Sequence, residues 1–282
     1  MNLIEAKHIS KAYGVIRKTV ALNGVDFYIG PGECKAIVGP NGAGKTTFLK
    51  IIAGVTTAFK GTLEGGATVG YCSEVPSNYP YLTAAENLVF FKSIVGSTVD
   101  VTEVLKIVNL ENERKLASQF SKGMKRKLEI ARALILDADL LIMDEPFDGL
   151  DPITSKDISD VLNKLKIGNK GIIISSHDMH RIQEVADEIC FISKGVIFRR
   201  QKINALLRLK VNYSGPVLSK SDLSFISEPS FDISGNTLFF SMETENDSSE
   251  IISRLVERKI RILTASIEPL DEQFRRIFNE SG

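Results

Sequence analysis

Residues 39–46 read Gly-Pro-Asn-Gly-Ala-Gly-Lys-Thr, which fits the pattern of a glycine, four residues and then Gly-Lys-Ser/Thr. The apolar stretch 35–38 predicts a strand before this segment, and residues 45–53 are expected to form a helix after it, as the pattern requires. Such glycines allow consecutive backbone N–H groups to converge on phosphate oxygens, and the helix N-terminus adds partial positive charge. The segment therefore predicts a binding site for the phosphates of ATP.

Two side chains of this loop have separate expected tasks. Lys45 is expected to reach the β- and γ-phosphates, and the Thr46 hydroxyl is expected to bind Mg²⁺. The residues expected to contact the nucleotide are Gly39, Pro40, Asn41, Gly42, Ala43, Gly44, Lys45, Thr46 and Thr47.

A second candidate group follows the apolar stretch Leu140–Met143, where Asp144, Glu145 and a proline come in succession. Open α/β sheets bind ligands at the carboxyl ends of their strands. Successive strand residues point to opposite sides, so the two carboxylates should have different roles. Asp144 is expected to hold Mg²⁺, and Glu145 to act as the general base on the attacking water. Alone, such a pair is more often a solvated strand end; the phosphate loop favours the catalytic interpretation.

His177 follows the β-branched stretch Ile172–Ser175, which predicts another buried strand. A histidine at this position can donate to a γ-phosphate oxygen and respond to its loss on hydrolysis. A lone histidine after a strand is usually a polar surface residue, so its functional interpretation depends on the other motifs.

Composition excludes several classes of protein. Among the 282 residues, 35 Lys and Arg balance 35 Asp and Glu, so no basic excess indicates a nucleic-acid partner. The three cysteines, far apart and without Cys-x-x-Cys spacing, are expected to be buried reduced thiols. No apolar run approaches the roughly 18 residues that span a bilayer, and the N-terminus lacks the apolar core of a signal peptide. If the protein works at a membrane, other chains must supply the spans.

Short apolar strands alternate with helices up to about residue 205, which predicts a mostly parallel sheet covered on both faces. Alternating stretches at 3–9 and 20–29 predict an antiparallel β subdomain before it. Residues 83–136 have helical periodicity, and Thr83 followed by Glu86 predicts a capping box at its start. The basic run 122–127 is expected to be a solvated helix face. The change in composition after residue 210 predicts domains at 1–210 and 211–282. The second, a small α+β domain, is expected to have strands at 237–242 and 261–265 and helices at 249–259 and 270–279.

The segment Phe120-Ser-Lys-Gly-Met124, followed by a basic helix, resembles the signature of ABC ATPases, usually Leu-Ser-Gly-Gly-Gln. The other family motifs match in order. Tyr13 matches the aromatic residue that stacks on adenine, and Glu74 lies at the Q-loop position. Gly149-Leu-Asp151 resembles the D-loop, and His177 the switch histidine. The resemblance covers about residues 1–205.

This resemblance implies the ABC cassette form of the P-loop NTPase fold, with a helical signature subdomain. It also implies ATP hydrolysis with Mg²⁺ and head-to-tail pairing with a second cassette, as a homodimer or heterodimer. Ser121, Gly123 and Asp151 would then serve a nucleotide held by the other cassette. A separate membrane permease is implied as partner, with the chain cytoplasmic on the inner face of the membrane.

Some signature residues differ from the family pattern, and Lys122 replaces the first signature glycine. This variant is common in the exporter-like branch, and the tail resembles the small C-terminal domain of drug- and antibiotic-exporter ATPases. Glu74 replaces the usual glutamine, so it could contact Mg²⁺ or mainly order the loop that faces the membrane subunits. The alternatives are a non-transport soluble ABC ATPase and a regulatory module that binds ATP without hydrolysing it.

Overall fold

The computed structural model describes residues 2–14, 17–75, 77–111, 114–203, 208–223, 225–226, 231–242 and 247–280. The chain divides into two compact units, Met1–Arg200 and Gln201–Gly282. This division lies before the boundary at residue 210 expected from the sequence, a position that falls inside a strand of the second unit.

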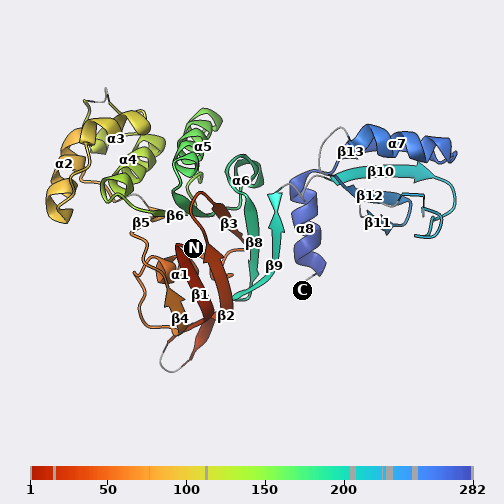
Figure 1. Cartoon of the computed structure of the whole chain (residues 1–282), viewed down its shortest axis with the longest axis horizontal. Helices are drawn as coiled ribbons and strands as arrows, with labels where there is room; N and C mark the ends of the chain where they lie inside the picture. The colour runs from red at the N-terminus through yellow and green to blue at the C-terminus, as the bar shows by residue number, and fades with distance from the viewer. Residues whose placement is uncertain are drawn as a thin grey trace. The chain divides into compact units, whose positions relative to one another are not determined.

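A central sheet of six strands runs through the middle of the first unit (Figure 1). Its strands are, in spatial order, β5 (Val69–Cys72), β6 (Leu140–Asp144), β7 (Gly171–Ser175), β3 (Cys34–Val38), β8 (Glu188–Ser193) and β9 (Val196–Lys202). Neighbours from β5 through β8 are parallel. Every residue of β3, β6 and β7 is buried, as expected for a parallel sheet covered on both faces. The mostly parallel sheet expected from the sequence is confirmed.

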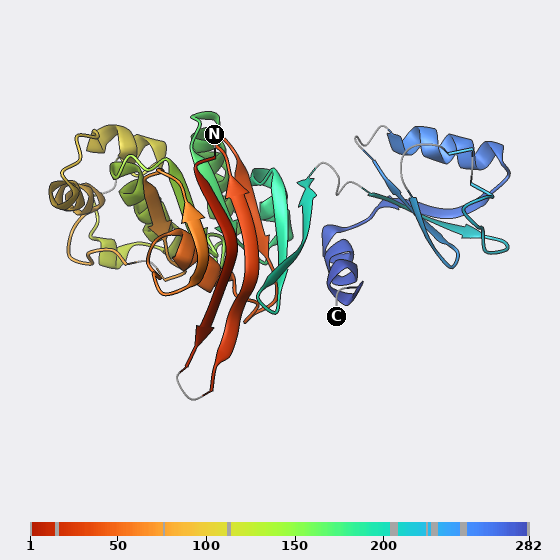
Figure 2. The same cartoon turned by 60° about the horizontal axis from the view of Figure 1, so that its bottom comes forward.

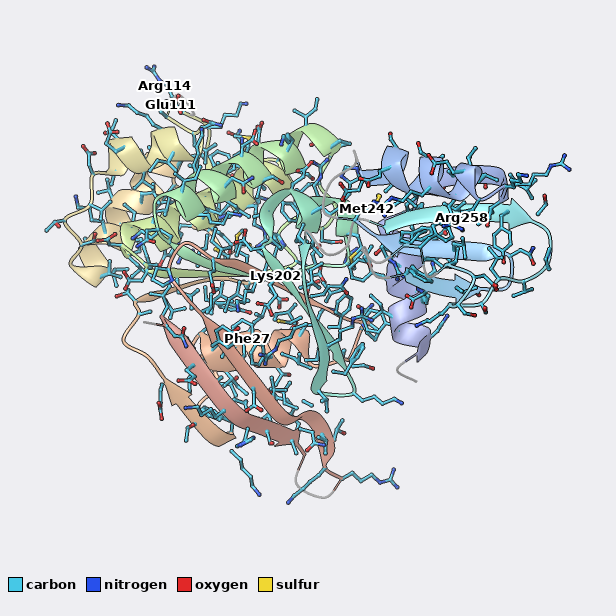
Figure 3. All side chains as sticks on the ribbon, turned by 45° about the vertical axis from the view of Figure 1, so that its right-hand side comes forward. Phe27, Glu111, Arg114, Lys202, Met242 and Arg258 are labelled. Carbon is cyan, nitrogen blue, oxygen red and sulfur yellow. The ribbon has the colours of Figure 1, made fainter. Side chains whose placement is uncertain are left out.

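An antiparallel sheet of β2 (Thr19–Ile29), β1 (Ile4–Tyr13) and β4 (Lys60–Glu64) forms the expected N-terminal β subdomain (Figure 2). Its inward residues share a core with α1 (Lys45–Ile52) and the central sheet. Phe27 of β2, labelled in Figure 3, packs edge-to-face on Phe48 of α1, with ring centroids 5.2 Å apart. The helix that follows the phosphate loop is thereby held between two sheets.

A helical subdomain lies beside β5 (Figure 1). It contains α2 (Ala84–Val95), α3 (Val101–Ile107), the 3-10 turn η1 (Ala117–Gln119) and α4 (Lys122–Ile135). The helix α5 (Pro152–Ile167) contacts α4, β7 and α6 (Met179–Val185). Each of α3, α4, α5 and α6 begins after an Asp or Ser whose side chain accepts a backbone N–H bond of the first turn.

The first turn of α2 is a capping box, as expected from Thr83 and Glu86. The Thr83 hydroxyl accepts from the Glu86 N–H at 3.3 Å, and the Glu86 carboxylate accepts from the Thr83 N–H at 2.8 Å. We therefore expect Thr83→Ala to lower the free energy of unfolding of the first unit by about 1 kcal/mol, measured by urea denaturation. Thr83→Ser keeps the hydroxyl and should change the free energy of unfolding by only a few tenths of about 1 kcal/mol. Equal losses in both variants would show that the cap is not the cause.

The second unit is a small α+β domain, as expected. Its antiparallel sheet has the order β11 (Phe231–Ser234), β12 (Thr237–Ser241), β10 (Arg208–Ser214) and β13 (Arg261–Ile267), with helices α7 (Asp247–Glu257) and α8 (Leu270–Glu280). Residues of β10 and β12 form its core with Ile251 and Leu255 of α7. The strands β10 and β11 were not predicted from the sequence. In the part of the chain that the structure describes, no helix is long and apolar enough to cross a membrane.

Candidate functional site

A cavity of about 540 Å³ opens where β3 leads into α1 and where β6 ends. Its volume is within the range of small-molecule sites. The cavity is lined by Tyr13, Ala21, Asn41, Gly42, Ala43, Gly44, Lys45, Thr46, Thr47, Glu74, Glu145, Asp148 and His177. Five motifs that are far apart in the sequence therefore meet here: Tyr13, the phosphate loop, Glu74, Glu145 and His177.

The phosphate loop requires glycine at particular positions. Gly44 has φ of 108°, and a Cβ built there would lie 2.4 Å from the Ala21 carbonyl oxygen. Gly39 would place a Cβ 2.1 Å from the Ile192 carbonyl oxygen. The Lys45 side chain folds back over this loop, and its Nζ donates to the Gly39 carbonyl at 2.8 Å and to the Pro40 carbonyl at 3.3 Å. The loop thus holds a largely buried cation at the cavity wall.

Three ionisable side chains from different elements converge on this wall. Glu145 Oε1 lies 3.9 Å from Lys45 Nζ, and Glu145 Oε2 lies 3.0 Å from His177 Nδ1. The lysine begins α1, the glutamate follows β6, and the histidine lies between β7 and α6. A carboxylate held between two nitrogen groups beside a phosphate loop is suited to accept a proton from water.

Glu145 has an uncommon backbone conformation, with φ of 46°. Non-glycine residues in this region are costly and persist where the surroundings hold them in place. The Glu145 N–H donates to the Ser175 hydroxyl at 2.9 Å, which is one such restraint. The strain therefore lies at the residue that the sequence predicts to be the base.

Asp144 is the last residue of β6, is only 1% exposed and is not among the residues that line the cavity. Its Oδ1 accepts from the Ser175 hydroxyl at 2.5 Å, whereas its Oδ2 is buried and has no hydrogen-bond partner among the described residues. A buried carboxylate oxygen in this state calls for a further donor or a cation. Asp144 therefore keeps one carboxylate oxygen available for such a donor or cation.

The other predicted site residues are placed differently. Tyr13 is 45% exposed at the cavity edge, with Lys11 Nζ 4.9 Å from its ring centroid. Ser121, Gly123 and Asp151 do not line the cavity. Ser121 caps α4 and Asp151 caps α5, and hydrogen bonds from Thr154 lower the pKa of the Asp151 carboxyl.

Sequence reasoning missed four residues at or beneath the cavity: Ala21, Asp148, Ser175 and Arg126. Asp148 pairs with Lys122 Nζ at 2.8 Å, and this hydrogen bond lowers the pKa of the Asp148 carboxyl. The hydroxyl at the end of an otherwise apolar strand was the available signal for Ser175.

The expectation of a solvated face at 122–127 was wrong, because Arg126 and Lys127 are buried.

Comparison with known proteins identifies the family to which a chain with this phosphate-loop cavity belongs. The family described as "ABC transporter" matches residues 22–148. The fluoroquinolones export ATP-binding protein of Mycobacterium tuberculosis is 35% identical over 215 residues, covering 69% of this chain and 71% of that protein. The Nod factor export ATP-binding protein I of Paraburkholderia xenovorans is 33% identical over 261 residues, covering 84% of each.

A solved structure of an ATP-binding subunit of an ABC transporter is similar to the first unit. It has a TM-score of 0.63 and 29% identity, and the match covers 72% of this chain and 91% of that one. The chain therefore belongs to the ABC transporter family, as an ATP-binding and ATP-hydrolysing subunit.

Proposed function

We propose that this subunit powers a separate membrane permease in the direction of export, by binding and hydrolysing ATP between two cassettes. The observation that carries the proposal is the meeting of Lys45, Glu145 and His177 on one cavity wall. The relatives named as export ATP-binding proteins support the direction.

The phosphate loop, Glu145, His177 and Tyr13 each have a role in this proposal. The loop 39–47 binds the phosphates through its backbone N–H groups, and Lys45 neutralises charge on the β- and γ-phosphates. Glu145 orients the attacking water and accepts its proton, while His177 holds the carboxylate and contacts the γ-phosphate. Tyr13 offers an exposed ring on which adenine can stack.

The same site suits Mg²⁺, which would neutralise phosphate charge when it accompanies ATP. Thr46 and Asp144 would hold it, and Glu74 lies on the same cavity. The unpartnered Oδ2 of Asp144 supports this assignment, because a metal or a metal-bound water would satisfy it. Oxygen ligands of this kind are those that Mg²⁺ prefers.

The signature residues are proposed to serve the nucleotide of the other cassette. Ser121, Gly123 and Asp151 lie outside their own chain's cavity. Ser121 begins α4, so its hydroxyl and the first-turn N–H groups can face a phosphate. A Cβ at Gly123 would lie 2.1 Å from Thr154 Cγ2, so glycine permits α4 to sit close against α5. The second cassette is either a copy of this chain or a different one.

Removing the Ser121 hydroxyl tests this sandwich. In a Glu145→Gln background that slows turnover, we expect Ser121→Ala to weaken ATP-driven dimerisation about tenfold or more, because a hydrogen bond to a charged group is lost. Binding of ATP to the monomer should stay within about twofold, since Ser121 is outside that cavity. Sedimentation velocity and fluorescent-nucleotide titration measure the two quantities.

Ser121→Asp is the matched control for the helix cap. The Ser121 hydroxyl accepts from the Met124 N–H at 3.2 Å, and aspartate preserves such a cap while placing negative charge against the phosphate. Both variants should therefore lose dimerisation. Loss of monomer binding in either, or undiminished dimerisation in the aspartate variant, would contradict the sandwich.

The permease is proposed to dock on an exposed apolar surface near Glu74. Its side chains are Val75, Tyr79, Tyr81, Val89 and Phe90, the last two on α2, and Tyr81 is 81% exposed. The Tyr79 and Phe90 rings pack edge-to-face with centroids 4.8 Å apart. Apolar side chains gathered in this way mark an interaction site. Docking there would hold the subunit at the inner face of the cell membrane, and the same loop lines the nucleotide cavity through Glu74.

A further inference from the structure

An arginine is buried inside the helix that begins at the signature. Arg126 of α4 is 2% exposed and is among the largest fully buried side chains of the described residues. A buried guanidinium is costly unless it is paired and hydrogen-bonded. Its charge partner is Glu129, one turn along the same helix, with NH1 at 3.0 Å from Oε2. The pair has neutral overall charge. This contact uses one N–H group of the guanidinium, and the other N–H groups are free to donate elsewhere.

Those donors reach backbone oxygens on two other segments. NH1 donates to the Ser73 carbonyl, and NH2 donates to the Glu74 carbonyl at 2.8 Å and to the Glu145 carbonyl at 3.4 Å. One planar group thus joins α4 to the loop after β5 and to the residue after β6. Arginine is suited to this arrangement because its donors project in a fixed fork.

Other residues of α4 also bind the loop that follows β5, but their contacts do not reach Glu145. Glu129 Oε1 accepts from the Ser77 N–H at 2.9 Å, and Arg132 donates to the Ser77 carbonyl. Asn78 donates to the Lys125 carbonyl at 3.1 Å. Of these contacts between α4 and the loop, the ones made by Arg126 extend to the strained residue at the end of β6.

Glu145 is therefore held at both backbone polar groups. Its N–H donates to Ser175, and its carbonyl accepts from the Asp148 N–H at 3.3 Å and from Arg126 at 3.4 Å, on either side of a residue with φ of 46°. A conformation of this kind persists only where the surroundings determine it. The direction of the Glu145 carboxylate follows from the same backbone angles.

We propose that Arg126 is a positioning residue for ATP hydrolysis, which ties the signature helix and the Glu74 loop to the backbone of Glu145. The inference rests on the proposed role of Glu145 as the base. Movement of α4, or of the loop that faces the permease, then changes the position of the base through the backbone of Glu145.

Arg126→Lys tests the proposal in the full chain. Lysine keeps the positive charge beside Glu129, but a single ammonium cannot reach the Glu129 carboxylate and the Ser73, Glu74 and Glu145 carbonyls together. We expect kcat for ATP hydrolysis to fall roughly ten- to a hundredfold, because misplacing a catalytic group costs about this much. The KM for ATP, and fluorescent-nucleotide affinity, should stay within about twofold of the original chain.

Arg132→Lys is the matched control, since it loosens the same loop from the same helix at Ser77 and leaves the Glu145 contact intact. We expect its kcat to stay within about threefold of the original. Arg126→Met combined with Glu129→Met removes both buried charges, so the Glu145 contact is lost without leaving an unpaired charge. The Glu129 bond to Ser77 is lost as well, and Arg132→Lys controls for loosening at that residue. The double variant should reproduce the low kcat of Arg126→Lys.

Three results would overturn the inference: full kcat in Arg126→Lys, an equal fall in Arg132→Lys, or a loss that appears only as a raised KM. Glu145→Gln, measured beside them, separates this inference from the proposed function. Full turnover in Glu145→Gln would show that Glu145 is not the base. An inactive Glu145→Gln together with a fully active Arg126→Lys would exclude the positioning role of Arg126 and leave the role of Glu145 intact.

Discussion

Glu145→Gln is expected to lower ATP turnover by about 10²–10⁴, because glutamine cannot accept the proton of the attacking water. The change conserves shape, and it removes a negative charge 3.9 Å from Lys45, where phosphates are expected to bind. Affinity for ATP should therefore be equal or higher. Phosphate release at saturating ATP and fluorescent-nucleotide titration measure the two quantities. With ATP present, the variant should accumulate as the closed dimer.

Asp160→Asn is a suitable control, because it removes an exposed carboxylate of α5 that pairs with Lys156 on the surface. Its turnover should match that of the original chain. Turnover in Glu145→Gln within a few fold of the original would show that another group takes the proton.

Lys45→Ala is expected to weaken ATP binding about 10- to 100-fold and to abolish measurable turnover. A hydrogen bond to a charged group is worth about 1.5–3 kcal/mol, and each 1.4 kcal/mol is a factor of ten in affinity. Lys45 is only 8% exposed and is already held at the cavity wall by the loop carbonyls, so little ordering is needed when the phosphates arrive. Isothermal titration with ATP in the presence of Mg²⁺ measures the loss.

Lys50→Ala removes the same charge from the same helix without changing a residue that lines the cavity. Its affinity for ATP should remain within about twofold of the original. If both lysine variants lost affinity equally, the effect would be a general one of charge or helix stability, and the contact of Lys45 with phosphate would be excluded.

Much of the first unit could be predicted because local and global signals agree there. The apolar runs of β3, β6 and β7 are short, β-branched or leucine-rich and bounded by polar residues, which is typical of strands buried on both faces. The capping box at Thr83 places the start of α2 correctly. In the second unit β10 was missed, because its alternating residues span the composition change at which a domain boundary was expected.

The convergence of the phosphate loop with Glu74, Glu145 and His177 was predicted from motif order, and these residues line one cavity. The contacts among them could not be predicted, because they depend on tertiary placement. Arg126 shows why. A basic run on an amphipathic helix is usually solvated, and only the packing of α4 against the 73–78 loop reveals which basic residue is inside. Asp148 likewise carries no signal until Lys122 is placed beside it.

Purification of the tagged full chain from membranes in mild detergent tests the central claim most directly, with mass spectrometry of the complex and an ATPase assay. The proposal predicts a stoichiometric partner with several membrane spans, and ATP hydrolysis by the complex that Glu145→Gln abolishes. If Val75→Asp and Tyr81→Asp, which place charge on the apolar surface, release that partner, the docking site is supported as well. Recovery of the chain alone from the soluble fraction, fully active without any membrane protein, would contradict the account and favour a non-transport ATPase.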